Sequence, residues 1–136
     1  AAVSASNELG MQTTVLTRRR EQGAALACVL SCEAGILDDF SGLEFDVLIN
    51  ATPVGSYAEP GLVVEIPALS MSGKIVFDMV TVPEETELIR KAKAAGATTI
   101  SGLEMLGEQA VGQARLWTGI EGNVDAFTSA ARRVRT

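Results

Sequence analysis

Histidine is absent from the sequence, which removes the commonest general base and the commonest metal ligand together. The two cysteines, Cys28 and Cys32, have no second pair to complete a zinc site, so we predict reduced thiols and no metal. No apolar run reaches the roughly 20 residues of a membrane-spanning helix, and no signal peptide is visible. The formal net charge of −6 argues against general nucleic-acid binding. We therefore expect a cytoplasmic protein with neither a membrane nor a nucleic acid as its partner.

Hydrophobic residues make up 47% of the 136 positions, enough for one globular domain with a real core. Apolar and β-branched runs predict strands over residues 11–17, 45–50, 74–79 and 98–101. Helical patterns cover residues 21–27, 85–95, 102–118 and 124–134, and residues 1–9 end a further helix at Gly10. Between them we predict a short strand at 27–31, a short helix or loop at 33–40, and loop or irregular chain over 52–72. The alternation of strands and helices predicts an α/β fold with a parallel sheet.

The stretch Thr98–Gly119 carries the clearest local signals, because a strand leads into a helix that ends at a glycine. Ser101 is a candidate N-cap, and Glu104 three residues later completes a capping box. Gly102 lets the backbone come close to whatever lies at the start of the helix. Apolar positions recur at helical spacing and are predicted to face a core: Leu103, Leu106, Ala110, Ala114 and Trp117.

Three blocks in order carry a resemblance to a known family. They are D-V-L-I-N-A-T-P-V-G at Asp46–Gly55, I-V-F-D-M-V at Ile75–Val80, and S-G-L-E-M-L-x-x-Q-A from Ser101, closing on L-W-T-G. Together they resemble shikimate dehydrogenase, the NADP-dependent enzyme of aromatic amino-acid and chorismate biosynthesis, from about Leu9 to about Arg133. The resemblance implies reversible hydride transfer between NADPH and the ketone of 3-dehydroshikimate, which gives shikimate.

The resemblance also implies what this sequence does not contain. A dinucleotide-binding fold opens with a G-x-G-x-x-G turn, and no such motif occurs here. In the family that turn lies just upstream of the first helix, and an N-terminal substrate domain carries a catalytic Lys–Asp pair. We therefore expect residues 1–136 to be one partial NADP-binding domain, with an incomplete Rossmann-like doubly wound parallel sheet lacking its first strand and glycine-rich loop. No catalytic residue is assigned, and the isolated fragment is expected to be inactive.

The same expectation concerns assembly. Without its first strand, the sheet would have a gap between the strands at 11–17 and 45–50, and exposed strand edges invite pairing with another chain. We expect a homodimer, a swapped element or a rearranged sheet, in addition to the missing N-terminal substrate domain as a partner.

The basic run after the first strand is the candidate NADP discriminator. It lies where a Rossmann fold meets the adenosine ribose, and guanidinium groups suit the 2′-phosphate that distinguishes NADP. The family has N-R-T-x-x-R here; Thr17 stands for the Asn, Arg18 matches the first Arg, and Arg19 replaces the Thr. Gln22 holds the place of the second Arg, although Arg20 could substitute for it in space. The alternative is a solvated basic run at the start of a helix.

The resemblance assigns further roles. Cofactor contacts fall on Asn50, Ala51, Thr52, Met79, Val80 and Gly102. Gln109 matches a glutamine that hydrogen-bonds the substrate hydroxyls, and Thr81 stands where the family usually has a substrate-contacting tyrosine. Asp78 is interpreted as orienting backbone at a strand end. Two alternatives stay open: a quinate/shikimate-type dehydrogenase, which the change at Thr81 favours, and a non-catalytic nucleotide-binding or interaction module.

Overall fold

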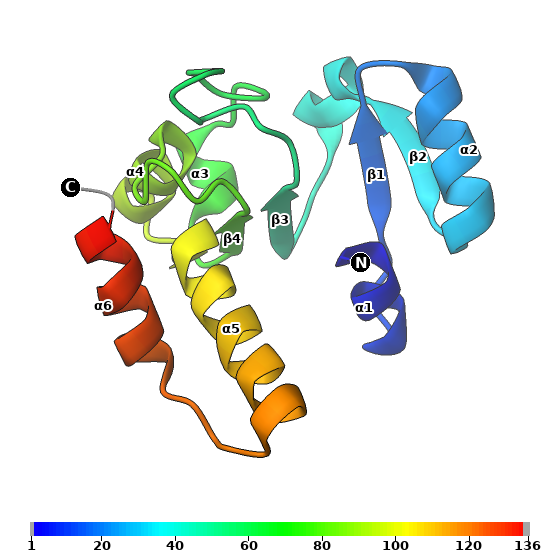
Figure 1. Ribbon diagram of the computed structural model, residues 1–136. Coiled ribbons are helices and arrows are strands. Elements are labelled where there is room, and N and C mark those ends of the chain that lie inside the picture. Colours follow the sequence, from blue (N-terminus) through cyan, green and yellow to red (C-terminus); the bar gives the residue numbers. More distant parts are fainter. Residues whose placement is uncertain (1, 135–136) are drawn as a thin grey trace. The chain divides into compact units, whose positions relative to one another are not determined.

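The computed structural model describes residues 2–134, apart from the side chains of residues 42, 69 and 134, and divides the chain into two compact units. The first unit ends at Glu44 and the second begins at Phe45. Each unit contains its own parallel sheet with helices, so the chain is α/β, as the alternating pattern predicted (Figure 1). None of the helices in the described part is both long and apolar enough to cross a membrane.

The first unit is a single strand–helix–strand crossover with an additional helix before it. Its elements are α1 (Ala2–Glu8), β1 (Thr14–Thr17), α2 (Arg20–Leu30), β2 (Glu33–Ile36) and the 3₁₀ helix η1 (Leu37–Gly42). The two strands run parallel, with Thr14 opposite Glu33 and Thr17 opposite Ile36. Gly23 lets α2 lie close to β1, because a Cβ there would come within 2.8 Å of the Thr17 hydroxyl oxygen.

Two predictions in this unit are wrong. Residues 27–31 do not form a strand; they are the last turn of α2, which ends at Ser31 in the left-handed region with φ 52°. Residues 33–36 are a strand, so the prediction of a short helix or loop at 33–40 is wrong there, whereas a short 3₁₀ helix does begin at Leu37. A short apolar run suits either a strand or a buried helix turn, and the choice here follows from the pairing of β2 with β1, which local sequence does not encode.

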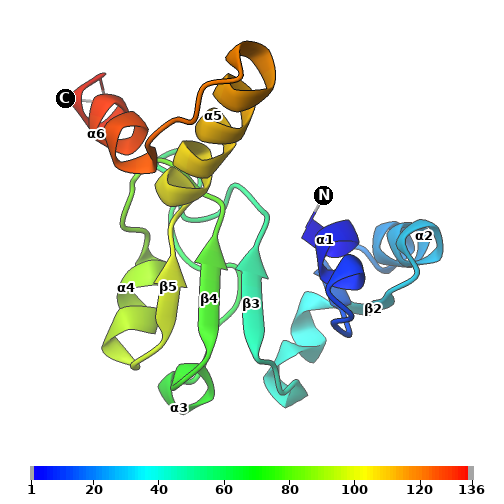
Figure 2. The same ribbon diagram turned by 90° about the horizontal axis from the view of Figure 1, so that it is seen from below.

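The second unit is a three-stranded parallel sheet in the order β3–β4–β5. Val47 pairs with Ile75, Asn50 with Asp78, and Ile75 with Thr98. Figure 2 shows the three strands side by side, all pointing toward the edge where α5 begins. The elements are β3 (Val47–Asn50), α3 (Ala68–Met71), β4 (Ile75–Asp78), α4 (Glu87–Ala94), β5 (Thr98–Ile100), α5 (Gly102–Thr118) and α6 (Val124–Val134).

The core of the second unit forms where α4 and the start of α5 meet the sheet. The buried apolar side chains include Met71, Val76, Leu88, Ile89, Ala92 and Leu103. The helix α4 begins at Thr86, whose hydroxyl oxygen accepts the amide of Ile89, and the chain turns at Gly96 with φ 80°. The strands at 45–50 and 74–79 and the helix at 85–95 are thereby confirmed, with boundaries a few residues shorter.

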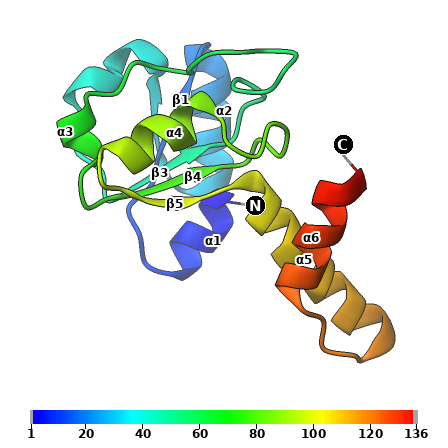
Figure 3. The ribbon, with the colours of Figure 1, turned by 90° about the vertical axis from the view of Figure 1, so that its left-hand side faces the viewer.

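The helix α5 confirms its predicted start and end but not its predicted buried face. Ser101 accepts the Glu104 amide at 3.3 Å, the Glu104 carboxylate accepts the Ser101 amide at 2.7 Å, and Gly119 ends the helix with φ 71°. Leu103 is buried, but Leu106 is 36% exposed and Trp117 is 79% exposed, so the prediction of a core role for these two is wrong. The start of α5 lies against Met79 and Val80, and farther along, the helix lies beside α6, as Figure 3 shows.

The expected interruption of the sheet is confirmed. β1 pairs with β2 and β3 pairs with β4, and no strand in the described part joins β1 to β3. A homodimer stays a prediction.

Candidate functional site

The carboxyl ends of β3, β4 and β5 bring together most of the predicted cofactor residues. The strands are parallel and neighbouring, and Asn50 lies directly opposite Asp78 in the register. Residues 50–52, residues 79–81 and Gly102 each follow one of these strand ends. In open α/β sheets this edge is where ligands bind. The structure therefore unites these segments of the second unit at the position expected of a ligand site.

Asn50 organises the loop that follows β3. Its amide nitrogen donates to the Val54 carbonyl at 2.9 Å and to Asp78 at 3.0 Å, and its amide oxygen accepts the backbone amide and the hydroxyl of Thr52 at 3.0 and 2.7 Å. These bonds use both donors and both lone pairs of the amide. The Thr52 hydroxyl is occupied too, because it also accepts the Val54 amide at 3.2 Å. Ala51, between Asn50 and Thr52, is exposed.

Asp78 is a buried carboxylate at the end of β4, with no exposed surface. One of its oxygens accepts the Asn50 amide and the Val80 backbone amide, both at 3.0 Å. The other oxygen accepts the Thr86 hydroxyl at 2.6 Å. Burying a carboxylate is costly unless hydrogen bonds replace its water, and three neutral donors do so here. The sequence identified Asp78 as a strand-end residue but did not identify Thr86, its partner eight positions later.

Gly102 is a glycine because the backbone that follows β4 leaves no room for a side chain. A Cβ at this position would lie 2.3 Å from the Val80 carbonyl oxygen and 2.7 Å from that of Met79. The start of α5 thus rests directly on the strand end that carries Met79 and Val80. The close approach that the sequence indicated is to the protein's own backbone.

Of the two predicted substrate residues, Thr81 lies near a strand end and Gln109 lies farther away. Thr81 follows Val80 and is half-buried. Gln109 is exposed on α5, seven residues after Gly102, which is about 10 Å along a helix. The structure places Gln109 on the helix that begins at the site, without bringing it to the strand ends.

The basic run Thr17–Arg20 forms the turn between β1 and α2, in the first unit. The Arg19 carbonyl accepts the Thr17 hydroxyl at 2.8 Å and the amides of Gln22 and Gly23 at 3.1 and 3.3 Å. The three arginine side chains are exposed, and Arg19 gives α2 no side-chain cap. Cations at the positive end of a helix are unfavourable by themselves, whereas an anion is stabilised there. The turn therefore suits an anionic group.

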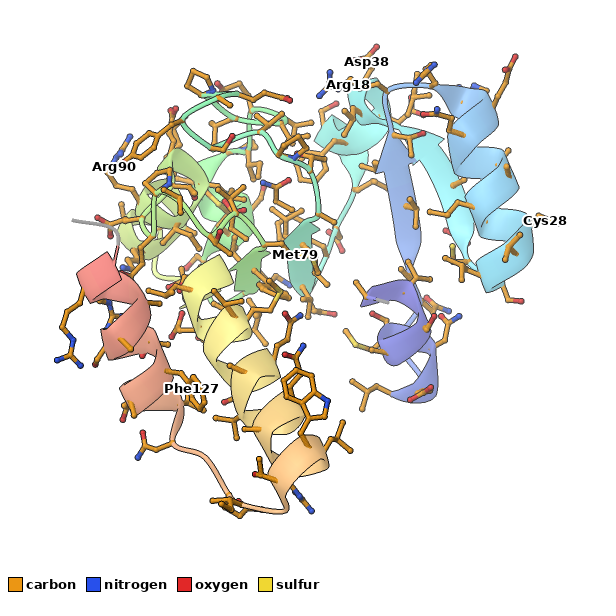
Figure 4. The ribbon with its side chains drawn as sticks, viewed as in Figure 1. Arg18, Cys28, Asp38, Met79, Arg90 and Phe127 are labelled. Atoms are coloured by element: carbon orange, nitrogen blue, oxygen red, sulfur yellow. The ribbon has the colours of Figure 1, made fainter. Side chains whose placement is uncertain are left out.

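An acidic residue that the sequence reasoning missed lies at the same edge of this unit. Asp38 follows β2 by two residues, and β2 is parallel to β1, so Asp38 and Arg18 lie at the same end of the sheet (Figure 4). The pairing of β1 with β2 was the missing information, because the sequence predicted no strand at 33–36.

A separate cleft of about 280 Å³ lies beside α4, β5 and α6. Its charged groups are occupied by one another: Arg132 Nε donates to Glu84 at 2.9 Å, Lys93 pairs with Glu85 at 2.9 Å, and Glu104 belongs to the capping box. The hydrogen bonds that Arg132 donates to the Glu84 carboxylate raise the pKa of Arg132. Across residues 2–134, no group of three acidic or cysteine side chains is placed to hold a metal ion. We therefore place the candidate site at the strand ends and not in this cleft.

Comparison with known proteins agrees with this geometry. A family profile described as the Shikimate 5'-dehydrogenase C-terminal domain matches residues 102–132, which cover α5 and most of α6. Shikimate dehydrogenase (NADP(+)) from Halorubrum lacusprofundi is 40% identical over 136 residues, spanning 97% of this chain and 49% of that protein. The chain is related to the C-terminal half of the shikimate dehydrogenases.

Solved shikimate dehydrogenases and their relatives share the fold. Shikimate 5-dehydrogenase from Thermus thermophilus, solved in complex with NADP(H) and shikimate, matches with a TM-score of 0.78 and 32% identity, over 95% of this chain and 48% of that one. Quinate dehydrogenase from Corynebacterium glutamicum, in complex with NAD, matches with a TM-score of 0.75 and 30% identity, over 93% and 48%. The Rossmann-like α/β class is thereby confirmed. The chain spans about half the length of the curated shikimate dehydrogenases it matches.

Proposed function

We propose that this chain is the NADP-binding part of a shikimate dehydrogenase. The observation that carries the proposal is its relation, over 97% of its length, to an NADP-dependent shikimate dehydrogenase, together with the gathering of residues 50–52, residues 79–81 and Gly102 at one sheet edge. The reaction is the reversible reduction of 3-dehydroshikimate to shikimate. When bound, the nicotinamide cofactor supplies the hydride.

The first unit carries the residues that we propose for the 2′-phosphate of NADP. Arg18, Arg19 and Arg20 present guanidinium groups at the uncapped start of α2, where a phosphate dianion is favoured by both the charges and the helix end. This fits the 2′-phosphate of NADP.

The second unit supplies the nicotinamide half and one side of the substrate site. The backbone at Ala51, Met79 and Val80 borders the cofactor, while Thr81 and Gln109 offer a hydroxyl and an amide to the substrate hydroxyls. Asp78 is buried and its carboxylate oxygens bond within the protein, so we assign the proton transfer to an N-terminal substrate domain with the family's Lys–Asp pair. The chain by itself is expected to bind cofactor ligands and not to turn over.

Calorimetric titration with NADP⁺, NAD⁺ and 2′,5′-ADP tests the cofactor assignment. We expect 2′,5′-ADP and NADP⁺ to bind the 136-residue chain and NAD⁺ to bind at least about tenfold more weakly, since a charge-assisted contact contributes about 1.5–3 kcal/mol. Arg18→Ala and Arg19→Ala should each remove most of that difference. Arg90→Ala, which removes an exposed arginine from α4 in the other unit, is the matched control. Equal affinity for NAD⁺ and NADP⁺ would overturn the NADP assignment.

A quinate dehydrogenase is the second candidate. Asp38 places a carboxylate near the basic turn, and a structure related to this chain is a quinate dehydrogenase in complex with NAD. A carboxylate that reaches the adenosine ribose favours its unphosphorylated form. Assays of the natural polypeptide that contains this chain, with shikimate and quinate and with both cofactors, decide between the two.

A further inference from the structure

The Asp78 carboxylate joins three segments that are remote in sequence. Through Asn50 it holds the end of β3, through the Val80 amide it holds the chain leaving β4, and through Thr86 it holds the start of α4. Asp78 and Thr86 are 0% and 1% exposed, so bulk solvent does not reach the pair. Both carboxylate oxygens are engaged, so losing one donor leaves a buried charge partly unsatisfied.

Each bond leads onward to a segment of the proposed cofactor site. Asn50 in turn fixes the loop at residues 51–54 through its hydrogen bonds to Thr52 and Val54. The Met79 amide donates to the Asn50 carbonyl at 3.0 Å, and Gly102 rests against the carbonyls of Met79 and Val80. Gly55 packs on Thr86, since a Cβ there would lie 3.6 Å from the threonine side chain. All three predicted nicotinamide segments are therefore fixed relative to one carboxylate.

We propose that Asp78, with Thr86 as its hydroxyl partner, is the positioning residue of the nicotinamide half of the site. This inference rests on the proposed function and adds to it residues that none of the predicted contacts include. Asp78 acts through Asn50 and Val80, without touching substrate, by fixing the turn at 51–54 and the strand end at 79–80. Apolar packing holds the strands together but does not fix the position of the backbone that follows each strand, which a binding site needs to have fixed.

The adenosine half of the site provides an internal reference. The basic turn at residues 17–20 belongs to the other unit and shares no hydrogen bond with this network among those described. A defect in positioning should therefore weaken NADP⁺ and spare 2′,5′-ADP, which lacks the nicotinamide. A general loss of folding should weaken both ligands equally.

The test uses Thr86→Val, which leaves the second carboxylate oxygen without its donor, and Asp78→Asn, which replaces that acceptor by a donor. Thr86→Ser retains the hydroxyl and should keep the NADP⁺ affinity and kcat/KM of the wild type. The matched control is Thr128→Val, because Thr128 is also buried but its hydroxyl donates to the Asp125 carbonyl within α6. Each variant is made in the natural polypeptide that contains this chain. NADP⁺ and 2′,5′-ADP affinities, kcat and KM, and hydrogen exchange of the peptide spanning residues 78–82 are measured.

We expect Thr86→Val and Asp78→Asn to lower kcat/KM and NADP⁺ affinity by about tenfold or more, the loss typical of a broken bond to a buried charge. Exchange at residues 78–82 should quicken, while 2′,5′-ADP affinity stays within about twofold. Thr86→Ser and Thr128→Val should match the wild type.

Unchanged NADP⁺ affinity and kcat/KM in Thr86→Val and Asp78→Asn would overturn the inference alone, and so would equal losses for both ligands or an equal effect of Thr128→Val. If Thr86→Val does not fold, the comparison of Asp78→Asn with Thr86→Ser tests the same hydrogen bond. A wild-type protein that binds neither ligand would overturn the proposed function, and this inference with it.

Discussion

At the scale of single residues, the strand-end site depends on backbone placement more than on projecting side chains. Asn50 and Thr52 direct their polar atoms to the loop itself, and Gly102 is required by the backbone of Val80. The resemblance to shikimate dehydrogenase pointed to these positions, and the glycine at the helix start independently indicated a close approach at Gly102. These signals did not reveal that Asp78 and Thr86 share a buried hydrogen bond, because that contact depends on how α4 returns to the sheet.

Gly102 offers a clean test at this scale. Gly102→Ala is expected to lower the free energy of unfolding by about 2–4 kcal/mol, because the new Cβ would meet backbone 2.3 Å away that cannot shift without disturbing β4. Gly112 lies on the same helix with nothing within 4 Å of a built Cβ, so Gly112→Ala should raise that free energy by about 0.5–1 kcal/mol. Urea unfolding followed by circular dichroism measures both. Similar effects of the two substitutions would contradict the close approach.

At the scale of elements, capped and periodic segments were predictable and long-range pairings were not. The helices α4, α5 and α6 were anticipated from caps, glycine stops and helical spacing. β2 was missed because Glu33–Ile36 becomes a strand only through pairing with β1. Trp117 was assigned to a core from spacing alone, yet periodicity says only which residues share a face and not whether another element covers that face.

The capping box at the start of α5 makes a prediction for this element. Ser101→Ala should lower the free energy of unfolding by about 1 kcal/mol, because the amide of Glu104 loses its acceptor in a buried position. Ser129→Ala, an exposed serine inside α6, should stay within about 0.5 kcal/mol of the wild type. Thermal unfolding of both variants provides the comparison. An effect of Ser129→Ala as large as that of Ser101→Ala would show that capping is not the cause.

At the scale of the whole molecule, two separate parallel sheets leave β1 and β3 each with one strand partner among the described residues. Unpaired edges of this kind invite pairing between chains. We expect the isolated chain to associate, with a mass above 14.2 kDa that rises with concentration in light scattering after size exclusion. A mass that stays at 14.2 kDa over a roughly hundredfold range of concentration would contradict this expectation.

The turn between β1 and α2 has a consequence for how cofactor preference can change. One backbone oxygen, the Arg19 carbonyl, collects the three hydrogen bonds that shape this turn, and Thr17 supplies its only side-chain donor among those described. The side chain at position 19 takes no part in them. If the basic turn selects the phosphorylated ribose as proposed, coenzyme preference can drift by substitution at this position while the scaffold stays intact. The preference between NADP and NAD could then change in evolution without loss of the fold.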